Sequence, residues 1–250
     1  MKGVYVLKIE ALTDVGKVRK INEDNFAFSV CDEYAYAIVA DGMGGHLAGE
    51  VASKMAVDII EEYVGMNLKS DLDHFAVKEL LIKAFTKANE EIYRYSCENE
   101  SVMGMGTTAT MCMVRNGFLI YAHIGDSRAY TAGKKIKQIT NDHSYVQELV
   151  KLGQITPEEA KVHPRRNYIT RAMGVENSVK TDAGIKTYKG EKILICSDGL
   201  HGKTEDAELF EILSKKTAKT GVKELIKLAN KRGGEDNITA VIMEGDTSDA

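Results

Sequence analysis

Four short apolar segments in the middle of the chain lie too close together in the sequence to pair as parallel strands. They cover residues 107–114, 118–124, 127–131 and 135–139. Asn116-Gly117 and Gly133-Lys134 are turn sequences typical of hairpins. Parallel pairing needs a crossover of about a dozen residues or more, which these connections do not have. The sequence therefore predicts an antiparallel meander.

Helices are predicted in pairs around this meander. The predicted helices cover residues 47–64, 73–95, 204–213 and 222–231. Further strands are expected at residues 4–12, 25–30, 34–40, 180–188, 192–196 and 238–243. Because the strands are joined locally and the helices do not alternate singly with them, βαβ winding is disfavoured. The predicted fold class is α+β, a four-layer α-β-β-α sandwich in which two antiparallel sheets are flanked by helix pairs.

Composition restricts the class of protein. The 250 residues include only two prolines and no low-complexity linker, so we predict a single domain over residues 1–250. A net charge of −4 without a basic run argues against nucleic acid as a partner. We expect no membrane association and a cytoplasmic location, because the sequence has neither a signal-peptide pattern nor a membrane-length apolar run. The four cysteines form no CxxC pair, which favours reduced thiols.

An apolar strand that ends in Asp-Gly occurs twice. Residues 35–40 lead into Asp41-Gly42, and residues 193–197 lead into Asp198-Gly199. A strand holds a side chain rigidly at its end, and glycine lets the backbone turn sharply. Carboxylate and carbonyl oxygens are ligands for a hard cation such as Mg2+ or Mn2+. An ordinary junction, with the aspartate near a helix N-terminus, is the alternative for a single motif.

Two more aspartates, Asp126 and Asp236, lie beside glycine or at a strand end. For Asp126 the usual alternative is a turn residue. Four carboxylates can gather only if cations neutralise them, and no Cys/His set competes for a softer metal. Together with Asp41 and Asp198 they predict a site for two or more Mg2+ or Mn2+ ions. Such ions lower the pKa of bound water and hold the oxygens of a phosphoryl group.

Other polar residues near the first Asp-Gly motif are candidates for the same site. Arg19, Glu23 and Asp24 could lie near Asp41, although a solvated loop with a surface ion pair is the ordinary alternative. The guanidinium of Arg19 suits bidentate binding of a phosphate. His46 follows the glycines, where a general acid could protonate a leaving alkoxide. A lone histidine at a helix start is more often structural.

Residues 161–173 form a basic segment without apolar periodicity. It is predicted to be an irregular loop of the kind that covers a site. Arg165, Arg166 and Arg171 could meet a phosphorylated substrate, whereas a solvated basic loop is an equal alternative for the first two. Just before this loop, Thr156-Pro157 predicts a helix start.

Eight motifs follow one another over nearly the whole chain. They are residues 13–24, Asp41-Gly42-Met43-Gly44-Gly45-His46, Gly106-Thr107-Thr108, Gly125-Asp126-Ser127-Arg128, Asp142-His143-Ser144, Ile169-Thr170-Arg171-Ala172-Met173-Gly174, Ser197-Asp198-Gly199-Leu200 and Glu235-Asp236-Asn237-Ile238. In type and order they resemble the motifs of metal-dependent serine/threonine protein phosphatases of type 2C, the PPM family, in its bacterial form. The resemblance implies the four-layer sandwich and direct hydrolysis of phosphoserine and phosphothreonine by metal-activated water, with two or three Mn2+ or Mg2+ ions per chain.

The resemblance also implies metal-binding roles for particular residues. Asp41 would bridge two ions, with the Gly42 carbonyl on one of them. Asp198 and Asp236 would complete the shell of one ion.

The remaining implied roles concern the rest of the pocket. Glu23 and Asp24 would act on the second ion, partly through water. Asp126 would share a third ion with Asp198, as in bacterial members, and Arg19 would grip the substrate phosphate.

A flap over about residues 141–175 is expected to affect substrate choice. Many eukaryotic members have a candidate acid histidine where Met43 stands, which moves attention to His46 in this chain and leaves the identity of the acid open.

The resemblance makes phosphorylated proteins the expected partners, namely substrates of a serine/threonine kinase and the kinase itself, and a monomer is expected. Two other functions stay open. One is a non-catalytic module that binds phosphoproteins through the same cleft. The other is a metal phosphoesterase for small phosphates or for a phosphorylated anti-sigma-factor antagonist.

Overall fold

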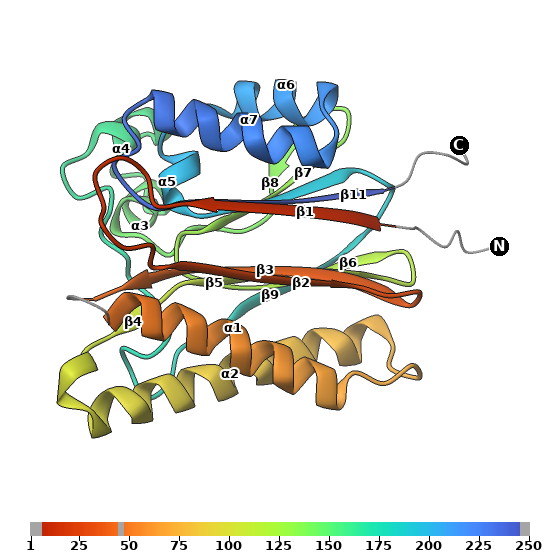
Figure 1. Cartoon of the computed structure of the whole chain (residues 1–250), viewed down its shortest axis with the longest axis horizontal. Coiled ribbons are helices and arrows are strands. Elements are labelled where there is room, and N and C mark those ends of the chain that lie inside the picture. The colour runs from red at the N-terminus through yellow and green to blue at the C-terminus, as the bar shows by residue number, and fades with distance from the viewer. Residues whose placement is uncertain (1–6, 45–47, 246–250) are drawn as a thin grey trace.

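Two antiparallel sheets pack face to face between two layers of helices (Figure 1). The structure is a computed structural model that describes residues 7–44 and 48–245. Helices α1 and α2 cover the outer face of one sheet, and α6 and α7 cover the outer face of the other. The predicted α-β-β-α order of layers is confirmed.

The first sheet has the strand order β2-β3-β5-β6-β9, with the short strand β4 paired to β3. Its strands are β2 (Asp24–Val30), β3 (Tyr34–Met43), β4 (Gly106–Thr107), β5 (Ala109–Arg115), β6 (Phe118–Ile124) and β9 (Asp182–Thr187). Its helical layer consists of α1 (Ala48–Asn67) and α2 (His74–Glu98), followed by the 3-10 turn η1 (Glu100–Val102).

The second sheet has the order β1-β11-β10-β7-β8. Its strands are β1 (Leu7–Asp14), β7 (Arg128–Ala132), β8 (Ile136–Gln138), β10 (Lys192–Cys196) and β11 (Ile238–Gly245). Helices α6 (Asp206–Lys215) and α7 (Ala218–Lys231) cover it. Three short helices gather at one end of the sandwich, on the left of Figure 1: α3 (Tyr145–Lys151), α4 (Pro157–Val162) and α5 (Asp198–His201).

The four strands that the sequence places in one meander belong to two sheets. Strands β5 and β6 pair in the first sheet, whereas β7 and β8 pair in the second. The chain crosses from one sheet to the other at residues 125–127, where Gly125 has φ +106°. The connections between these four strands are short and their pairs are antiparallel, as expected. The change of sheet between β6 and β7 was not predicted, because the connecting turn is as short as a hairpin turn.

Both faces of β3 are buried, which explains its almost continuous apolar sequence. Ala37 and Val39 pack in the core between the two sheets. Ile38 and Ala40 point the other way and pack against the α1–α2 layer. This two-sided burial fixes the register of β3, because a slip by one residue would exchange the two sets. The end of β3 that carries Asp41 is therefore held rigidly.

Helix α4 begins where the sequence predicts. Thr156 caps it by accepting a hydrogen bond from the Glu159 N–H, and the Glu159 carboxylate accepts one from the Thr156 N–H. This capping box fixes the start of the segment that leads into the basic loop.

Gly199, directly after Asp198, packs so closely on the start of β11 that a side chain has no room. A Cβ there would lie 2.0 Å from the backbone oxygen of Asn237. We expect Gly199→Ala to lower the free energy of unfolding by about 2 kcal/mol or more, through overpacking against backbone. Gly65→Ala, in α1 with nothing within 4 Å, is the matched control and should raise it by about 0.5–1 kcal/mol. Urea unfolding measures both, and a Gly199→Ala variant as stable as wild type would contradict the close packing.

Candidate active site

Asp41 is fixed at the end of β3 by hydrogen bonds to its backbone. Its N–H donates to Thr108 Oγ1 at 3.0 Å, and its carbonyl accepts from the Thr108 N–H at 2.8 Å and from Thr107 Oγ1 at 2.9 Å. Asp24 at the start of β2 is its partner in the strand register. Two carboxylates of the first sheet are therefore placed side by side with little freedom to move apart.

Asp24 links the two sheets. Its side chain is buried, and Oδ2 accepts a hydrogen bond from Ser197 Oγ at 2.7 Å. Ser197 ends the β10 segment and directly precedes Asp198. Burial, together with the charges of Asp198 and Asp236, raises the pKa of Asp24 to about 7, against the hydrogen bonds from Ser197 and Thr239. Carboxylates of the second sheet therefore lie within electrostatic reach of this one.

The other predicted aspartates share this field. Burial, followed by the charges of Asp24, Asp198, Asp126 and Asp236, raises the pKa of Asp41 well above its ordinary value. Burial and the charge of Asp236 raise the pKa of Asp198 to about 6. Burial and the charge of Asp198 raise the pKa of Asp126 as well. The charged forms of Asp24, Asp41, Asp126 and Asp198 are thus destabilised by burial and by neighbouring aspartates, Asp236 among them, in one pocket.

Three oxygens in this pocket are buried and lack a hydrogen-bond partner. They are Glu23 Oε1, Asp24 Oδ1 and Asp126 Oδ1. A buried carboxylate oxygen without a donor is costly unless a cation compensates it. An all-oxygen set of carboxylates suits Mg2+ or Mn2+. The residues therefore fit the predicted ions.

The carboxylates do not close around one point. Among residues 7–44 and 48–245, no group of three or more His, Cys, Asp or Glu side chains is arranged to hold a metal ion directly. Mg2+ loses water reluctantly and often takes only one or two carboxylates from the protein. An open set of carboxylates is compatible with ions that keep water in their shells.

The side chain of Glu23 packs against the first turn of α1, where a Cβ on Gly49 would lie 2.5 Å from Glu23 Oε1. Gly42 packs against the same turn, and a Cβ on Gly42 would lie 2.1 Å from Gly49 O. The two glycines thus let the end of β3, the helix and the glutamate approach closely. Burial raises the pKa of Glu23, while Arg19 and the Gly49 N–H act in the opposite direction.

Arg19 pairs with Asp236 in this structure. Its guanidinium donates to Asp236 Oδ2 at 2.9 Å, and the two side chains are 48% and 37% exposed. Exposed ion pairs contribute only about 0–1 kcal/mol, so other partners can replace this one. Arg19 also lies within electrostatic reach of Glu23 and Asp41, at the mouth of the pocket. Arg19 was predicted to lie near the carboxylates, and in the structure it does, with Asp236 as its partner.

His46, the candidate general acid, lies outside the described residues.

Asn237 is part of the last sequence motif, but no role of its own was predicted for it, and it ties the Arg19 loop to the second sheet. Its side-chain amide donates to the carbonyls of Val15 and Ile21 at 3.0 and 2.9 Å, and its Oδ1 accepts from the Glu23 N–H at 2.8 Å. A single asparagine after Asp236 carries no periodic signal. Its three hydrogen bonds reach residues more than 200 positions away in sequence, which local patterns cannot show.

The three arginines of the basic loop have different environments. Arg171 pairs with Asp182 at 3.1 Å. Arg165 lies over the ring of Tyr145 at 5.6 Å and over Tyr168 at 5.9 Å. Arg166 is close enough to Glu235, the neighbour of Asp236, to lower the pKa of that carboxyl together with Lys203, whose hydrogen bond is the larger cause. Arg166 is therefore the loop arginine within electrostatic reach of a residue next to the carboxylate pocket.

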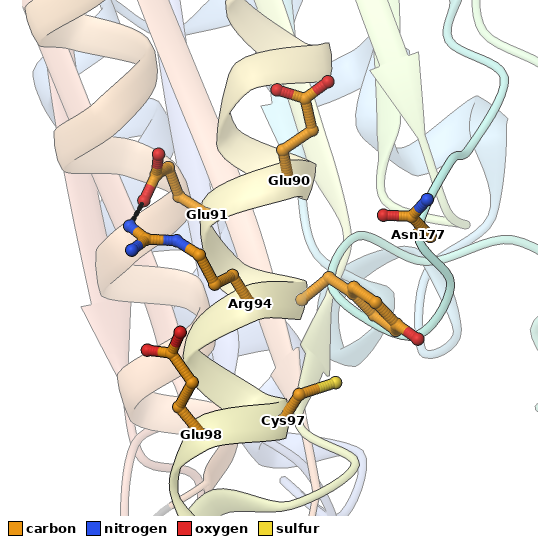
Figure 2. A pocket seen from close by; sticks show the side chains of 7 residues that line it. Glu90, Glu91, Arg94, Cys97, Glu98 and Asn177 are labelled. Atoms are coloured by element: carbon orange, nitrogen blue, oxygen red, sulfur yellow. Dashed lines mark hydrogen bonds and ion pairs between the residues drawn. The ribbon is translucent and has the colours of Figure 1, made fainter.

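A separate hollow of about 480 Å3 lies along α2, away from the carboxylates. Figure 2 shows Glu91, Arg94 and Glu98 on one side of the helix and Asn177 on a loop at its other side. Arg94 pairs with Glu91 in the same helix. The polar groups that line the hollow therefore do not converge on one point, as those of an active site do.

A family model described as Protein phosphatase 2C matches residues 17–240. The chain belongs to the protein phosphatase 2C family. It is 39% identical over 241 residues to the serine/threonine phosphatase stp of Listeria monocytogenes serotype 4b, with 95% of each chain covered. The crystal structure of serine/threonine phosphatase Stp1 from Staphylococcus aureus matches with a TM-score of 0.90 at 35% identity, over 98% of this chain and 97% of that one.

A further structure of the family, the catalytic domain of the phosphatase PstP in complex with two manganese ions, matches with a TM-score of 0.84 at 34% identity, over 96% and 99% of the two chains. The predicted family, fold and class of enzyme, a protein phosphatase, are confirmed. Metal dependence is consistent with this family. No helix in the described part of this protein phosphatase 2C member is both long and apolar enough to cross a membrane.

Asp24→Asn tests whether Asp24 resists ionisation in metal-free protein. The pKa of Asp24 is 3.8 in the unfolded chain and about 7 in the native chain. Between these two pH values, Asp24 is protonated in the native chain and ionised in the unfolded chain. The contribution of Asp24 to stability is therefore present at low pH and lost as the pH passes its folded-state pKa. With a chelator present, we expect Asp24→Asn to gain stability relative to wild type between about pH 4 and pH 8.

Urea unfolding across this pH range measures the difference. Asp58→Asn, on the exposed side of α1, is the matched control and should show no such gain. A difference between Asp24→Asn and wild type that stays constant with pH would show that Asp24 titrates normally.

Proposed function

We propose that this chain hydrolyses phosphoserine and phosphothreonine on proteins, using water activated by two or three Mn2+ or Mg2+ ions. The observation that carries the proposal is the gathering of Asp24, Asp41, Asp126 and Asp198, whose pKa values are raised by burial and by one another's or Asp236's charge, in one pocket. Asp24 and Asp126 each keep a buried oxygen without a partner there. Bound divalent cations supply the positive charge that lowers the pKa of water and neutralises phosphoryl oxygens. A relative of the same fold is described in complex with two manganese ions, which supports the choice of metal.

Each sheet supplies part of the proposed metal-binding set. Asp41 at the end of β3 and the Gly42 carbonyl would hold ions from the side of the first sheet. Asp198 and Asp236 would hold them from the side of the second sheet. These assignments come from the family resemblance. The positions of the residues at strand and helix ends, and the effect of the Asp236 charge on Asp198, support them.

Asp24 and Glu23 have a different environment from the other carboxylates. Asp24 is held by Ser197 and is buried, so it acts on the second ion through water in our proposal. Glu23 keeps one buried oxygen free for the same task. Asp126, whose pKa is raised by burial and by the charge of Asp198, would hold the third ion together with Asp198.

Arg19 binds the substrate phosphate. Its guanidinium stands half-exposed at the mouth of the pocket in a weak pair with Asp236. A dianionic phosphate offers a stronger, bidentate partner than one exposed carboxylate. Arg19 would be free to turn to the phosphate if Asp236 held a metal ion. His46 stays a prediction as the acid that protonates the leaving alkoxide.

We also propose a single catalytic domain over residues 1–250, with residues 141–175 as a flap. Phosphorylated proteins as substrates follow from the family. A serine/threonine kinase as counterpart and as substrate, a monomeric state and a cytoplasmic location stay predictions from the sequence.

Asp41→Asn and Asp198→Asn test the metal assignment. Each removes a charged ligand, and we expect the rate on a phosphothreonine peptide with Mn2+ to fall by about 10³-fold, because metal charge is worth several kcal/mol in such a reaction. Far-UV circular dichroism should be unchanged, since clustered negative charge is removed. Asp58→Asn is the control. Wild-type turnover in either variant would refute the assignment.

The same assay separates the other two candidate functions. A non-catalytic module binds the phosphopeptide without any Mn2+-dependent turnover. A small-molecule phosphoesterase turns over nucleotides or sugar phosphates faster than phosphopeptides. Either result would contradict the proposal, which requires metal-dependent turnover and a preference for phosphopeptides.

Arg19→Ala should mainly raise KM for the phosphopeptide, by about 10–100-fold, the value of a charged hydrogen-bonded contact. Steady-state kinetics at saturating Mn2+ measure KM and kcat separately. Arg94→Ala, an exposed arginine in an ion pair on α2, controls for the loss of a positive charge. An unchanged KM would remove Arg19 from the substrate site.

A further inference from the structure

The turn that carries Asp126 is held by hydrogen bonds at every residue. It is the point where the chain crosses from β6 in one sheet to β7 in the other. Gly125 O accepts from the His143 N–H at 2.7 Å, and the Gly125 N–H donates to His143 Nδ1 at 3.1 Å. One histidine therefore satisfies both backbone groups of the residue before Asp126.

A second histidine holds Asp126 itself. His201 Nε2 lies 3.0 Å from the Asp126 carbonyl oxygen, to which it donates. His201 ends the short helix α5, which begins with Asp198. Because a carbonyl oxygen can only accept, the ring hydrogen of this bond is on Nε2. The same four-residue helix thus carries one carboxylate of the pocket and fixes the backbone of another.

The third residue of the turn is anchored to β5. Ser127 Oγ lies 2.8 Å from Thr108 Oγ1, and the Ser127 carbonyl accepts from Thr110 Oγ1 at 3.3 Å. Gly125 has φ +106°, and a Cβ there would be 2.5 Å from Thr108 Cβ. The turn therefore packs so closely on Thr108 that position 125 has no room for a side chain.

The Asp126 carboxylate contrasts with this tightly held backbone. It is 5% exposed, and its Oδ1 is buried without a hydrogen-bond partner. Backbone hydrogen bonds that fix the turn leave the side chain free to bind something else. A rigid backbone with an unsatisfied, inward carboxylate oxygen is the arrangement expected of a positioned ligand.

We infer that His143 and His201 are positioning residues that hold Asp126 at the metal pocket, by fixing the backbone on either side of its carboxylate. The inference rests on the proposed function, in which Asp126 and Asp198 share the third ion. Neither histidine is proposed to touch the ion or the substrate.

The protonation of His143 follows from its neighbours. Because Nδ1 accepts from the Gly125 N–H, the ring hydrogen is on Nε2. Nε2 lies 3.2 Å from Asp182 Oδ2 and donates to it, while Arg171 of the basic loop donates to Asp182 Oδ1 at 3.1 Å. Thr170 N–H also donates to the His143 carbonyl at 2.8 Å. His143 therefore connects the Asp126 turn with the end of the basic loop.

The two histidines use different ring nitrogens toward the turn, which permits a matched test. An asparagine amide takes the place of Nδ1, and a glutamine amide takes the place of Nε2. His143→Asn and His201→Gln therefore keep the contact with the turn, whereas His143→Gln and His201→Asn remove it. Asparagine is thus the conservative change at position 143 and the disruptive change at position 201, and glutamine is the reverse.

The measurement is the number and affinity of Mn2+ ions bound per chain, from equilibrium dialysis with electron paramagnetic resonance of free Mn2+. Asp126→Ala is the reference and should lose the weakest ion. His143→Gln and His201→Asn should weaken that ion by about tenfold, the value of one buried hydrogen bond. His143→Asn and His201→Gln should bind as wild type does.

A double variant separates positioning from general damage. If His143 acts through Asp126, His143→Gln should add no further loss of Mn2+ binding to Asp126→Ala. Circular dichroism and thermal unfolding without metal check that each variant is folded. If a disruptive variant does not fold, the conservative variant at the same position still tests whether the retained contact keeps Mn2+ binding as in wild type.

Two failures are distinguishable. If Asp126→Ala binds as many ions as wild type with equal affinity, the proposed role of Asp126 is wrong. If Asp126→Ala loses an ion while His143→Gln and His201→Asn keep it, the positioning inference alone is overturned. It is also overturned if both asparagine variants behave alike and both glutamine variants behave alike, because the effect would then follow side-chain size.

Discussion

The mutual repulsion of buried carboxylates at one end of the sandwich is the constraint on which the rest of the structure depends. Each of Asp24, Asp41, Asp126 and Asp198 has a raised pKa for which burial is the largest cause and other aspartates are further causes. Such groups separate unless the backbone holds them, and they become protonated unless cations compensate their charges. The fold holds them in place with strand ends and backbone hydrogen bonds.

A sandwich of two antiparallel sheets is suited to this task because each sheet contributes its own rigid ends. β2 and β3 bring Asp24 and Asp41 from one sheet, and β10 and β11 place Asp198 and Asp236 beside the other. Three apolar clusters, one between the sheets and one under each helix layer, fix the layers relative to one another. Burial on both faces of the sheets thus stabilises a pocket that is itself electrostatically unfavourable.

Sequence patterns predicted the parts of this arrangement that repeat along the chain. The strand before Asp41, the α1–α2 pair and the cap at Thr156 have periodic or local signals, and the structure has each of them. Helix α5 has four residues and no periodicity, so it could not be predicted. The change of sheet at residues 125–127 depends on which strands finally pair, and Asn237 acts through partners more than 200 residues away. Local patterns carry neither kind of information.

The pairing of Arg19 with Asp236 connects these constraints with the proposed chemistry. A pocket of repelling carboxylates attracts any nearby cation, and Arg19 is placed by the loop that Asn237 ties to β11. The pair is exposed, so it is weak and its partners can be exchanged. A divalent ion is a stronger partner for Asp236, and a phosphate is a stronger partner for Arg19. In the proposed function, the same electrostatics that place Arg19 beside Asp236 would therefore release it toward the substrate once ions and phosphate bind.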